Sequence, residues 1–353
     1  MARATVLEDV TSIDWTIRDY RTEDEARILE FLRLVLGGGS SGFTRNAAFW
    51  RWKHFQNPFG ASQLLVAEGE EILGLRAFMR WTFATPGGEV RAVRPVDTST
   101  HPGYRRLGIF SRLTQASAER ARDGGANLIY NTPNAKSMAG YLKLGWSKMD
   151  RPWLLMRILR PVRIAAAMLG LRRLTSISDD DFFDAPPDPI AALLKDPEYV
   201  TRLLERDDVL HRRAIRTTRT VPFLGWRYAS PPSVRYHALW VQGGRADAAI
   251  IYRPKVRNGL REVRLSEVFL SDESGHSVRE AIRRLVRLVR ADYLVAVAAP
   301  GSAHWRGLMR SGFIPLPWAG PIFTVRPLAW PAGYPDPTRL ENWHLSLGDL
   351  EIF

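Results

Sequence analysis

Cysteine is absent from this chain of 353 residues. A protein without thiols forms no disulfides, no zinc–thiolate sites and no cysteine nucleophile. Long apolar runs are absent too, since none approaches the roughly 18 residues that a membrane-spanning helix needs. The first fifteen residues carry acidic side chains where a signal peptide would have an apolar core. We therefore expect a cytoplasmic protein.

Positive charge is abundant: the formal net charge is +13, and most of it comes from arginine. A hydrophobic content of 45% and a charged content of 25% are typical of soluble globular proteins, and the length suggests two domains. The excess charge favours an anionic partner, namely a phosphorylated cofactor, a nucleic acid or a lipid surface. A well-solvated, arginine-rich surface explains the same charge, so this observation leaves the partner open.

The first 155 residues alternate helical and strand patterns joined by short loops, which is typical of an α/β domain. Helical periodicity predicts helices within residues 20–38, 46–58, 110–125 and 133–146, and alternation predicts strands within residues 64–69, 71–83, 89–100 and 127–132. We divide the chain into a first domain (1–155), a basic helix and linker (156–190), a second domain (191–330) and a tail that packs on the core (331–353).

Residues 151–174 mix leucine, isoleucine and methionine with six arginines. Such a segment is typical of a basic amphipathic helix that makes peripheral contact with an anionic membrane. The alternative is a linker with a packing helix, which we favour because Pro161 interrupts the segment.

The second half repeats the first weakly. "FWRWKHFQNP" is echoed by "FLGWRYASPP", and Pro133 and Gly145 recur as Pro300 and Gly312 at one offset. Around residues 268–278, acidic side chains stand where the first half has arginine and glycine. We therefore expect a duplicated fold whose second copy has lost an anion site.

That anion site is predicted in "TSTHPGYRRLGIF", residues 98–110, where a strand end leads through a turn into a helix. Backbone amides at a helix N-terminus bind anions, and a glycine lets the ligand approach closely. Taken alone, the stretch fits an ordinary surface turn equally well.

A second motif makes the site specific. Arg105 to Phe110 resembles the coenzyme A pyrophosphate loop of the GNAT acetyltransferase superfamily, Gln/Arg-x-x-Gly-x-Gly/Ala. "NTPNAKSMAGYLKLGW" resembles the later Asn-x-x-Ala/Ser-x-x-x-Tyr-x-x-x-Gly-Phe pattern of that superfamily, whose positions are filled by Asn134, Ser137, Tyr141, Gly145 and Trp146. The resemblance covers residues 20–155, and it implies GNAT-like domains with mixed, mostly antiparallel twisted sheets flanked by helices.

The resemblance also implies acetyl-CoA as co-substrate, with no metal. The implied cofactor-binding residues are Thr98, Ser99, Thr100, Arg105, Arg106, Leu107, Gly108, Ile109, Phe110, Ser111, Asn131, Thr132 and Asn134. Phe110 departs from the family, which has glycine or alanine at this position, and its ring narrows the expected groove.

Acyl transfer to an amine needs a proton donor for the leaving thiolate, a donor for the tetrahedral oxyanion and a base for the amine. Tyr141 stands where the resemblance places the donor to the coenzyme A sulfur; the alternative is a packed aromatic. Asp97 is the only carboxylate on the strand that leads to the site, but alternation points it away if Thr98 faces the cofactor. His101 is a further candidate base, although a histidine before proline in a turn is more often an exposed loop residue.

The carboxylate of Phe353 is the last candidate base, because the final residues form an apolar tail that can pack back onto the core. Tandem aminoglycoside acetyltransferases of the enhanced-intracellular-survival type are similar in their arginine-rich loop and in holding a terminal carboxylate near the active site. They also carry a third region that is not found in this sequence.

An aromatic cluster precedes the cofactor strand and comprises Phe49, Trp50, Trp52, Phe55 and Trp81. It could stack a sugar or an aromatic amine, but we favour core packing because aromatic side chains dominate cores.

The leading functional hypothesis is N-acetyl transfer from acetyl-CoA to a small amine such as an amino sugar, an antibiotic or a metabolite. The first alternative is a tandem aminoacyl transferase that uses aminoacyl-tRNA. The coenzyme A loop of the first domain looks intact, which argues against this alternative and therefore against a nucleic-acid partner. The second is a non-catalytic acyl-CoA sensor. The sequence leaves the acceptor and the oligomeric state open.

Overall fold

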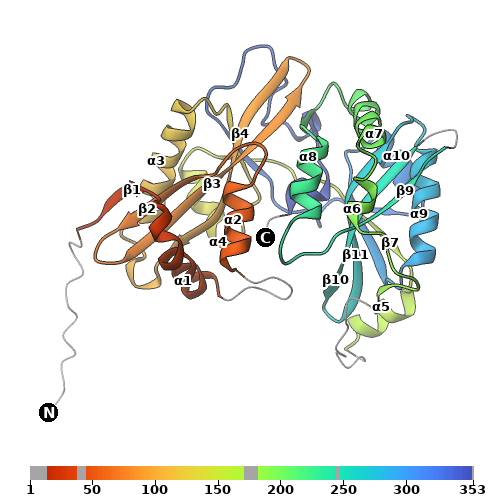
Figure 1. The fold of residues 1–353 in the computed structure, drawn as a ribbon, viewed down its shortest axis with the longest axis horizontal. Coiled ribbons are helices and arrows are strands. Elements are labelled where there is room, and N and C mark those ends of the chain that lie inside the picture. The colour runs from red at the N-terminus through yellow and green to blue at the C-terminus, as the bar shows by residue number, and fades with distance from the viewer. Residues whose placement is uncertain (1–13, 38–44, 171–181, 244–246, 352–353) are drawn as a thin grey trace.

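The structure, a computed structural model, describes residues 14–37, 45–170, 182–243 and 247–351. These residues form two lobes that lie side by side, the first coloured red to yellow and the second green to blue (Figure 1). Each lobe is built around one twisted sheet with helices on it. The predicted fold class, two mixed and mostly antiparallel sheets flanked by helices, is confirmed.

The first sheet is antiparallel except where β4 meets β5 and, in a short side branch, where β8 meets β15. Its strands, in spatial order, are β1 (Thr16–Asp19), β2 (Gln63–Glu68), β3 (Ile72–Thr85), β4 (Gly88–Thr100), β5 (Leu128–Asn131), β14 (Thr324–Pro327) and β6 (Ser147–Lys148). A short strand, β8 (Ile215–Thr217), also pairs with β3 and carries β15 (Trp343–His344).

Both faces of this sheet are buried, because successive residues of β2 enter different apolar clusters. Leu64 and Val66 pack with α1 (Glu25–Leu36) and α2 (Ala47–Phe55). Leu65 packs on the other face with α3 (Ile109–Asp123). This face also carries α4 (Ala135–Lys143), whose Tyr141 packs with α3 and β5. The result is a three-layer sandwich that holds β4 and β5 rigidly between helices.

The second sheet runs in the order β13 (Ile314–Leu316), β7 (Leu154–Ile158), β12 (Tyr293–Val297), β11 (Leu260–Leu270), β10 (Ala248–Arg257) and β9 (His237–Val241). The helices of this half are α5 (Pro161–Met168), α6 (Ile190–Leu193), α7 (Pro197–Leu210), α8 (Val221–Leu224), α9 (His276–Leu288), α10 (Ala303–Arg310) and α11 (Leu347–Leu350).

Besides β8 and β15, which the second half adds to the first sheet, one strand crosses between the halves in each direction. β14, from the second half of the chain, lies between β5 and β6 of the first sheet. β7, which directly follows the first half, lies between β12 and β13 of the second sheet. Each sheet is therefore completed by the other half, and a boundary at residue 155 falls inside a strand of the second sheet.

The two crossing segments touch at Gly320. Its Cα is so close to Pro152 that an added Cβ would lie 1.9 Å from the Pro152 carbonyl oxygen. Arg151 fixes the crossing by donating a hydrogen bond to the carbonyl of Gly320. Only glycine fits here, because the obstacle is backbone that cannot rotate away.

The expectation of a basic amphipathic helix over residues 151–174 is wrong in its first part. Residues 154–158 form β7 because Leu155 is fully buried between two pairing strands, and Pro161 starts the short helix α5 at a position where its missing N–H costs nothing. Residues 171–174 lie outside the described residues. Among the helices of the described ranges, none has both the length and the apolar character needed to cross a bilayer.

The lobes meet through a reciprocal pair of tryptophans. The indole of Trp52 donates to the carbonyl of Trp226 at 2.8 Å, and the indole of Trp226 donates to the carbonyl of Trp52 at 2.9 Å. Their rings stack with centroids 5.3 Å apart. Trp50, Trp52 and Trp81 are at most 3% exposed. Core packing therefore accounts for these three indoles, whereas Phe55 is 42% exposed.

The strand exchange predicts that both lobes unfold together. We expect Gly320→Ala to lower the free energy of unfolding by about 1–3 kcal/mol, the usual cost of overpacking, and to leave a single transition in calorimetry or urea titration. Gly225→Ala is the matched control, because the nearest atom to its added Cβ lies at an ordinary 3.9 Å. Two separate transitions in the wild-type protein would contradict the prediction.

Candidate active site

A wedge opens in the first sheet between β4 and β5. The two strands pair in parallel only at Ala92 with Leu128 and Val93 with Ile129. Beyond these residues β4 continues against β3, while β5 continues against β14 as far as Asn131. The strands therefore diverge toward their C-terminal ends, and the groups that follow on each strand face the gap.

The start of α3 lies just after β4. Gly108 adopts φ +76° and Arg106 adopts φ +69°, so the chain turns sharply into the helix. Arg112 makes the first helical bond, to the carbonyl of Gly108, and no side chain among the described residues caps this end. The amides of the first turn, Ile109 to Ser111, are thus available to an anion, with Arg105 and Arg106 exposed beside them.

Phe110 points its ring at α4. The ring lies against Gly140, where an added Cβ would come within 2.7 Å of it, and meets the ring of Tyr141 edge-on at 5.4 Å. On another side the guanidinium of Arg76, from β3, stacks on it at 4.6 Å. Gly140 therefore makes room for the bulky side chain that departs from the family pattern.

Tyr141 is buried, and its hydroxyl lies 3.3 Å from the hydroxyl of Thr98 on β4. Phe110 and Trp146 hold its ring from two sides. The structure thus brings together two residues that sequence reasoning had assigned to catalysis and cofactor binding. Their roles stay predictions.

The other predicted cofactor residues have mixed surroundings. Ser99 and Thr100 end β4 in register with β3, and Ser99 is buried with no hydrogen-bond partner for its hydroxyl among the described residues. Thr132 lies within reach of Arg94, at 3.1 Å. Asn134 uses its side chain to cap α4 by accepting from the amide of Ser137. Leu107 is half-buried in the loop before α3.

Asp97 occupies a bulge of β4 with φ +46° and faces α2, opposite to Tyr141. Its carboxylate accepts from Lys53 at 2.7 Å and lies 3.1 Å from Nε2 of His54. The other ring nitrogen of His54 lies 3.0 Å from the hydroxyl of Ser62. This buried chain of polar groups lies on the face of the first sheet that carries α2 and packs against the second half of the chain.

The charged neighbours of Asp97 keep its carboxylate ionised. Burial acts to raise the pKa of Asp97, but the charge of Lys53 and the contact with His54 outweigh it and hold that pKa below its ordinary value. Burial lowers the pKa of Lys53 against the attraction of Asp97, and it also lowers the pKa of His54. Asp97 is therefore a weakly basic carboxylate that is already engaged by its neighbours.

Residues 349–351 of the tail reach the wedge region. Arg94, buried on β4, donates to the carbonyls of Asp349 and Leu350, and Thr132 lies 3.4 Å from the same Leu350 oxygen. From the second half, Arg227 donates to the carbonyls of Gly348 and Glu351. Two buried guanidiniums thus hold the tail by its backbone. Phe353, the predicted carboxylate, lies outside the described residues.

Glu351 is the carboxylate that sequence reasoning missed. It is buried and accepts from Arg253 and Arg264, while its Oε2 has no hydrogen-bond partner among the described residues. It lines a small void of about 20 Å³ between the halves, together with Trp52, Lys53, Met79, Trp81, Arg94, Trp226 and Arg227. An acidic residue in an apolar tail was the only signal for it in the sequence.

The second half lacks the features of the first site. Its strands β11 and β12 also pair in parallel over three residues and then separate, and residues 345–347 of the tail line a small void together with residues of both strands. At the start of α9 the carboxylate of Asp272 accepts from the amides of His276 and Ser277. A carboxylate of the chain itself thus takes the place that an anion would need.

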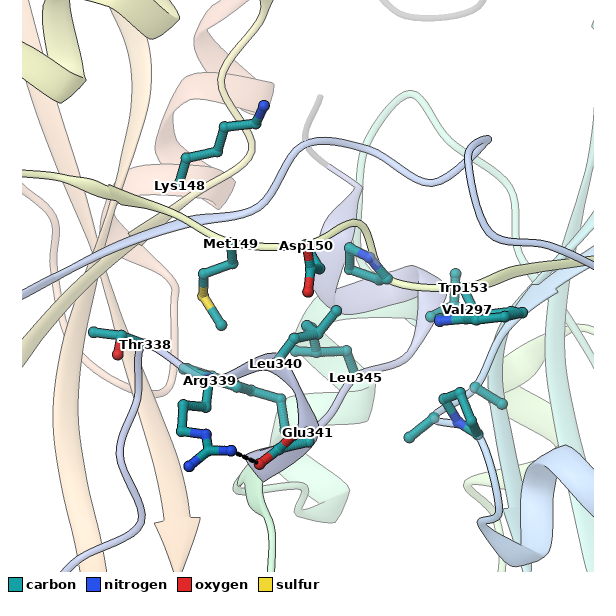
Figure 2. Close-up of a pocket in the computed structure, with 15 residues that line it drawn as sticks. Lys148, Met149, Asp150, Trp153, Val297, Thr338, Arg339, Leu340, Glu341 and Leu345 are labelled. Carbon is teal, nitrogen blue, oxygen red and sulfur yellow. Dashed lines mark ion pairs between the residues drawn. The ribbon is translucent and has the colours of Figure 1, made fainter.

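The largest described cavity, about 600 Å³, lies between the lobes (Figure 2). Figure 2 shows Met149 and Asp150 on one wall and the segment with Thr338, Leu340 and Leu345 across from them. Val297 and Pro300, at the end of β12, close it from the second lobe. Its charged lining residues are Lys148, Asp150 and the ion pair of Arg339 and Glu341.

Comparisons with known proteins agree with this geometry. Residues 16–149 match the sequence model of the acetyltransferase (GNAT) domain. No curated protein sequence matches the chain significantly. Three solved structures share its fold: a probable N-acyltransferase from Enterococcus faecalis (TM-score 0.59, 10% identity, covering 90% of this chain and 73% of that one), a GCN5-related N-acetyltransferase from Kribbella flavida (0.57, 15%, 90% and 72%), and Eis1 from Mycobacterium abscessus (0.52, 14%, 89% and 74%).

The low identities show a shared fold and no more, whereas the domain match covers the wedge, the loop and Tyr141. The expectation drawn from the two sequence motifs is thereby confirmed for the first half: residues 16–149 form an acetyltransferase (GNAT) domain.

Proposed function

We propose that the protein transfers an acetyl group from acetyl-CoA to the amine of a small molecule, using the wedge of the first half. The observation that carries this proposal is the divergence of β4 and β5 directly beside the uncapped start of α3. Acetyl-CoA supplies the activated acyl group, and the chain supplies the groups that hold it and manage the protons.

The residues around the wedge fit such a ligand. The loop at Arg105–Gly108 offers amides and two guanidiniums to a diphosphate. Nearby, Arg76 is fully buried, and its Nε and Nη1 have no hydrogen-bond partner among the described residues. Burial lowers the pKa of Arg76, so an anion close to it would favour its charged form. The unused hydroxyl of Ser99 is a further polar group on the strand that would line the pantetheine arm.

Tyr141 is the proposed proton donor. A phenol is neutral at pH 7, and its contact with Thr98 orients the hydroxyl toward the open side of β4. From there it would give a proton to the departing sulfur and keep the thiolate from attacking the product.

Asp97 and carboxylates of the C-terminal tail are the groups that we propose accept the proton of the acceptor amine. Asp97 faces α2 and would take a proton through water, and Glu351 places a second carboxylate at the void between the halves. The carboxylate of Phe353 remains a candidate because the tail that leads to it is held by Arg94 and Arg227.

The two alternative functions differ in what they need. A transferase that uses aminoacyl-tRNA needs a nucleic-acid surface and no coenzyme A site, whereas a sensor needs the site without the proton donor. Salt-dependent binding of tRNA without binding of coenzyme A would favour the first. Binding of coenzyme A with no turnover over a broad panel of amines would favour the second.

The first test is binding of coenzyme A to the loop. Gly108→Glu adds a negative charge at the proposed phosphate site, and we expect coenzyme A affinity, measured by calorimetry, to fall by about tenfold or more, as the loss of charge-assisted hydrogen bonds implies. Gly333→Glu is the matched control, because Gly333 has a similar φ of +80° in open surroundings. Equal affinity in the two variants, or no binding by the wild type at micromolar concentrations, would refute the site.

The second test concerns Tyr141. Once an amine acceptor is found in a panel, we expect Tyr141→Phe to lower kcat by about 10²–10⁴-fold, the usual contribution of a general acid. The affinity for coenzyme A should change little, because the ring still packs between Phe110 and Trp146. An unchanged kcat would leave the tyrosine with a packing role only.

The third test measures how much the carboxylate of Asp97 stabilises the fold. Asp97→Asn leaves the buried Lys53 without its carboxylate, so we expect the free energy of unfolding to fall by about 3–5 kcal/mol. Asparagine tolerates the positive φ, which keeps backbone strain out of the comparison. The double variant Lys53→Met/Asp97→Asn should recover part of the loss.

The pH dependence has a definite sign. Because the pKa of folded Asp97 lies below its ordinary value of 3.8, its stabilisation is complete above that pH and is lost as the pH falls below it. The Asn variant and the wild type should therefore differ most near neutral pH and converge in acid. A difference in the free energy of unfolding that stays constant at all pH values would show that the ion pair is not the source of that difference.

A further inference from the structure

Three of the seven histidines and one aspartate are buried together in the second half, apart from the wedge. Asp207 lies in the last turn of α7 and His211 ends that helix, so both are on one face. His304 comes from α10 and His344 from β15. Each of the four offers one ligand atom, and these atoms all lie within 4.8 Å of one another.

The hydrogen bonds of the cluster are incomplete. Nε2 of His211 lies 2.9 Å from Nδ1 of His304, and the rings of His211 and His344 stack in parallel with centroids 3.5 Å apart. Nδ1 of His344 is buried and has no hydrogen-bond partner among the described residues. A buried nitrogen without a partner is rare in folded proteins, and a bound ion is one way in which such an atom is satisfied.

We propose that Asp207, His211, His304 and His344 bind one Zn²⁺ ion. Three imidazoles and one carboxylate form a ligand set that suits zinc, which takes four nitrogen, sulfur or oxygen ligands in a tetrahedron. Calcium and magnesium prefer oxygen ligands and would be poorly served here. The absence of cysteine leaves histidine as the nitrogen or sulfur ligand of choice in this chain.

The surroundings of His304 and Asp207 fit this role. Nε2 of His304 lies 2.7 Å from the carbonyl oxygen of Val268, which leaves Nδ1 to face the cluster. Zinc-binding histidines commonly donate their second nitrogen to a carbonyl in this way, which fixes the ring. Asp207 accepts from the amide of Leu270, and one of its oxygens lies 3.2 Å from His304.

To bind the ion, the four ligand atoms need to move only a short distance toward one another. Zinc–nitrogen bonds of about 2.0–2.1 Å put tetrahedral ligand atoms roughly 3.3 Å apart. Since all four atoms already lie within 4.8 Å, shifts of about an ångström and a tilt of the parallel rings of His211 and His344 suffice.

An ion can reach the cluster from solvent. A cavity of about 500 Å³ is lined by Asp207 and His344, among others. The cations beside it are neutralised: Arg216 pairs with Asp208, and Arg219 pairs with Glu267 and Asp349. The divalent charge would therefore meet Asp207 without a free guanidinium opposing it.

The position of His344 gives the site a consequence. His344 directly precedes the tail segment that lies beside the ends of β11 and β12 and then reaches Arg94. The ion would fasten the start of this tail to α7 and α10. The proposal that the cluster binds zinc is independent of the proposed acetyltransferase function. Only the effect of zinc on the tail at the active site depends on that function.

The test is a zinc titration of the untagged full-length chain after treatment with EDTA and dialysis. With a chromophoric chelator as competitor, we expect one Zn²⁺ per chain, a rise in Tm, and an affinity at least tenfold lower in His344→Gln. His276→Gln is the matched control, because His276 is exposed at the start of α9 and its Nδ1 lies 3.1 Å from the hydroxyl of Ser274, which is not one of the proposed ligands. Equal affinity in His344→Gln and wild type, or no stoichiometric binding, overturns the proposal.

A second measurement covers the case in which His344→Gln fails to fold. Co²⁺ bound to the wild-type chain should give the intense visible absorption of tetrahedral cobalt, which excess Zn²⁺ removes. Weak octahedral bands, or bands that persist in His304→Gln at the same intensity, overturn the proposal without any need for the first variant.

Discussion

The exchange of β7 and β14 between the two sheets is the constraint on which the rest of the structure depends. Because β14 pairs with both β5 and β6, β5 is held from its outer side and is free to diverge from β4 on its inner side. The wedge of the first half thus relies on a strand from the second. The same exchange draws the tail across the interface, where Arg94 and Arg227, one from each half, bind its carbonyls.

In each half a helix connects two strands that pair in parallel, β4–α3–β5 and β11–α9–β12, but the starts of the two helices differ. In the first, a glycine and two arginines leave the start of α3 open to a ligand. In the second, Asp272 accepts from the helix amides, and the tail lies beside the strand ends. The second half therefore contributes structure to the site: β14, the tail, and the indole of Trp226 that locks the lobes together.

Local features of this site were predictable from the sequence, and contacts between distant segments were not. The loop at residues 105–108 and the helix after it are encoded within a few residues, so their pattern predicted them correctly. Alternation also predicted that Asp97 points away from Thr98, but its partner Lys53 lies 44 residues earlier and no pattern links the two. The same holds for β7: its apolar and basic residues fitted a helix from the sequence, and only pairing with the distant strands β12 and β13 makes the segment a strand. Arg94 resembled an ordinary polar position of a strand, and only the tail's return explains its burial.

The strand order has a consequence for how the chain is made. Asn131 of β5 pairs with Thr324 of β14, which is synthesised 193 residues later. At about 5–20 residues per second, the ribosome needs about 10–40 s to bridge that interval. Throughout it, β5 and β6 present open edges, which are sites of aggregation in nascent proteins. The first half, although it comes out of the ribosome first, can complete its sheet only after residues 324–327 have emerged.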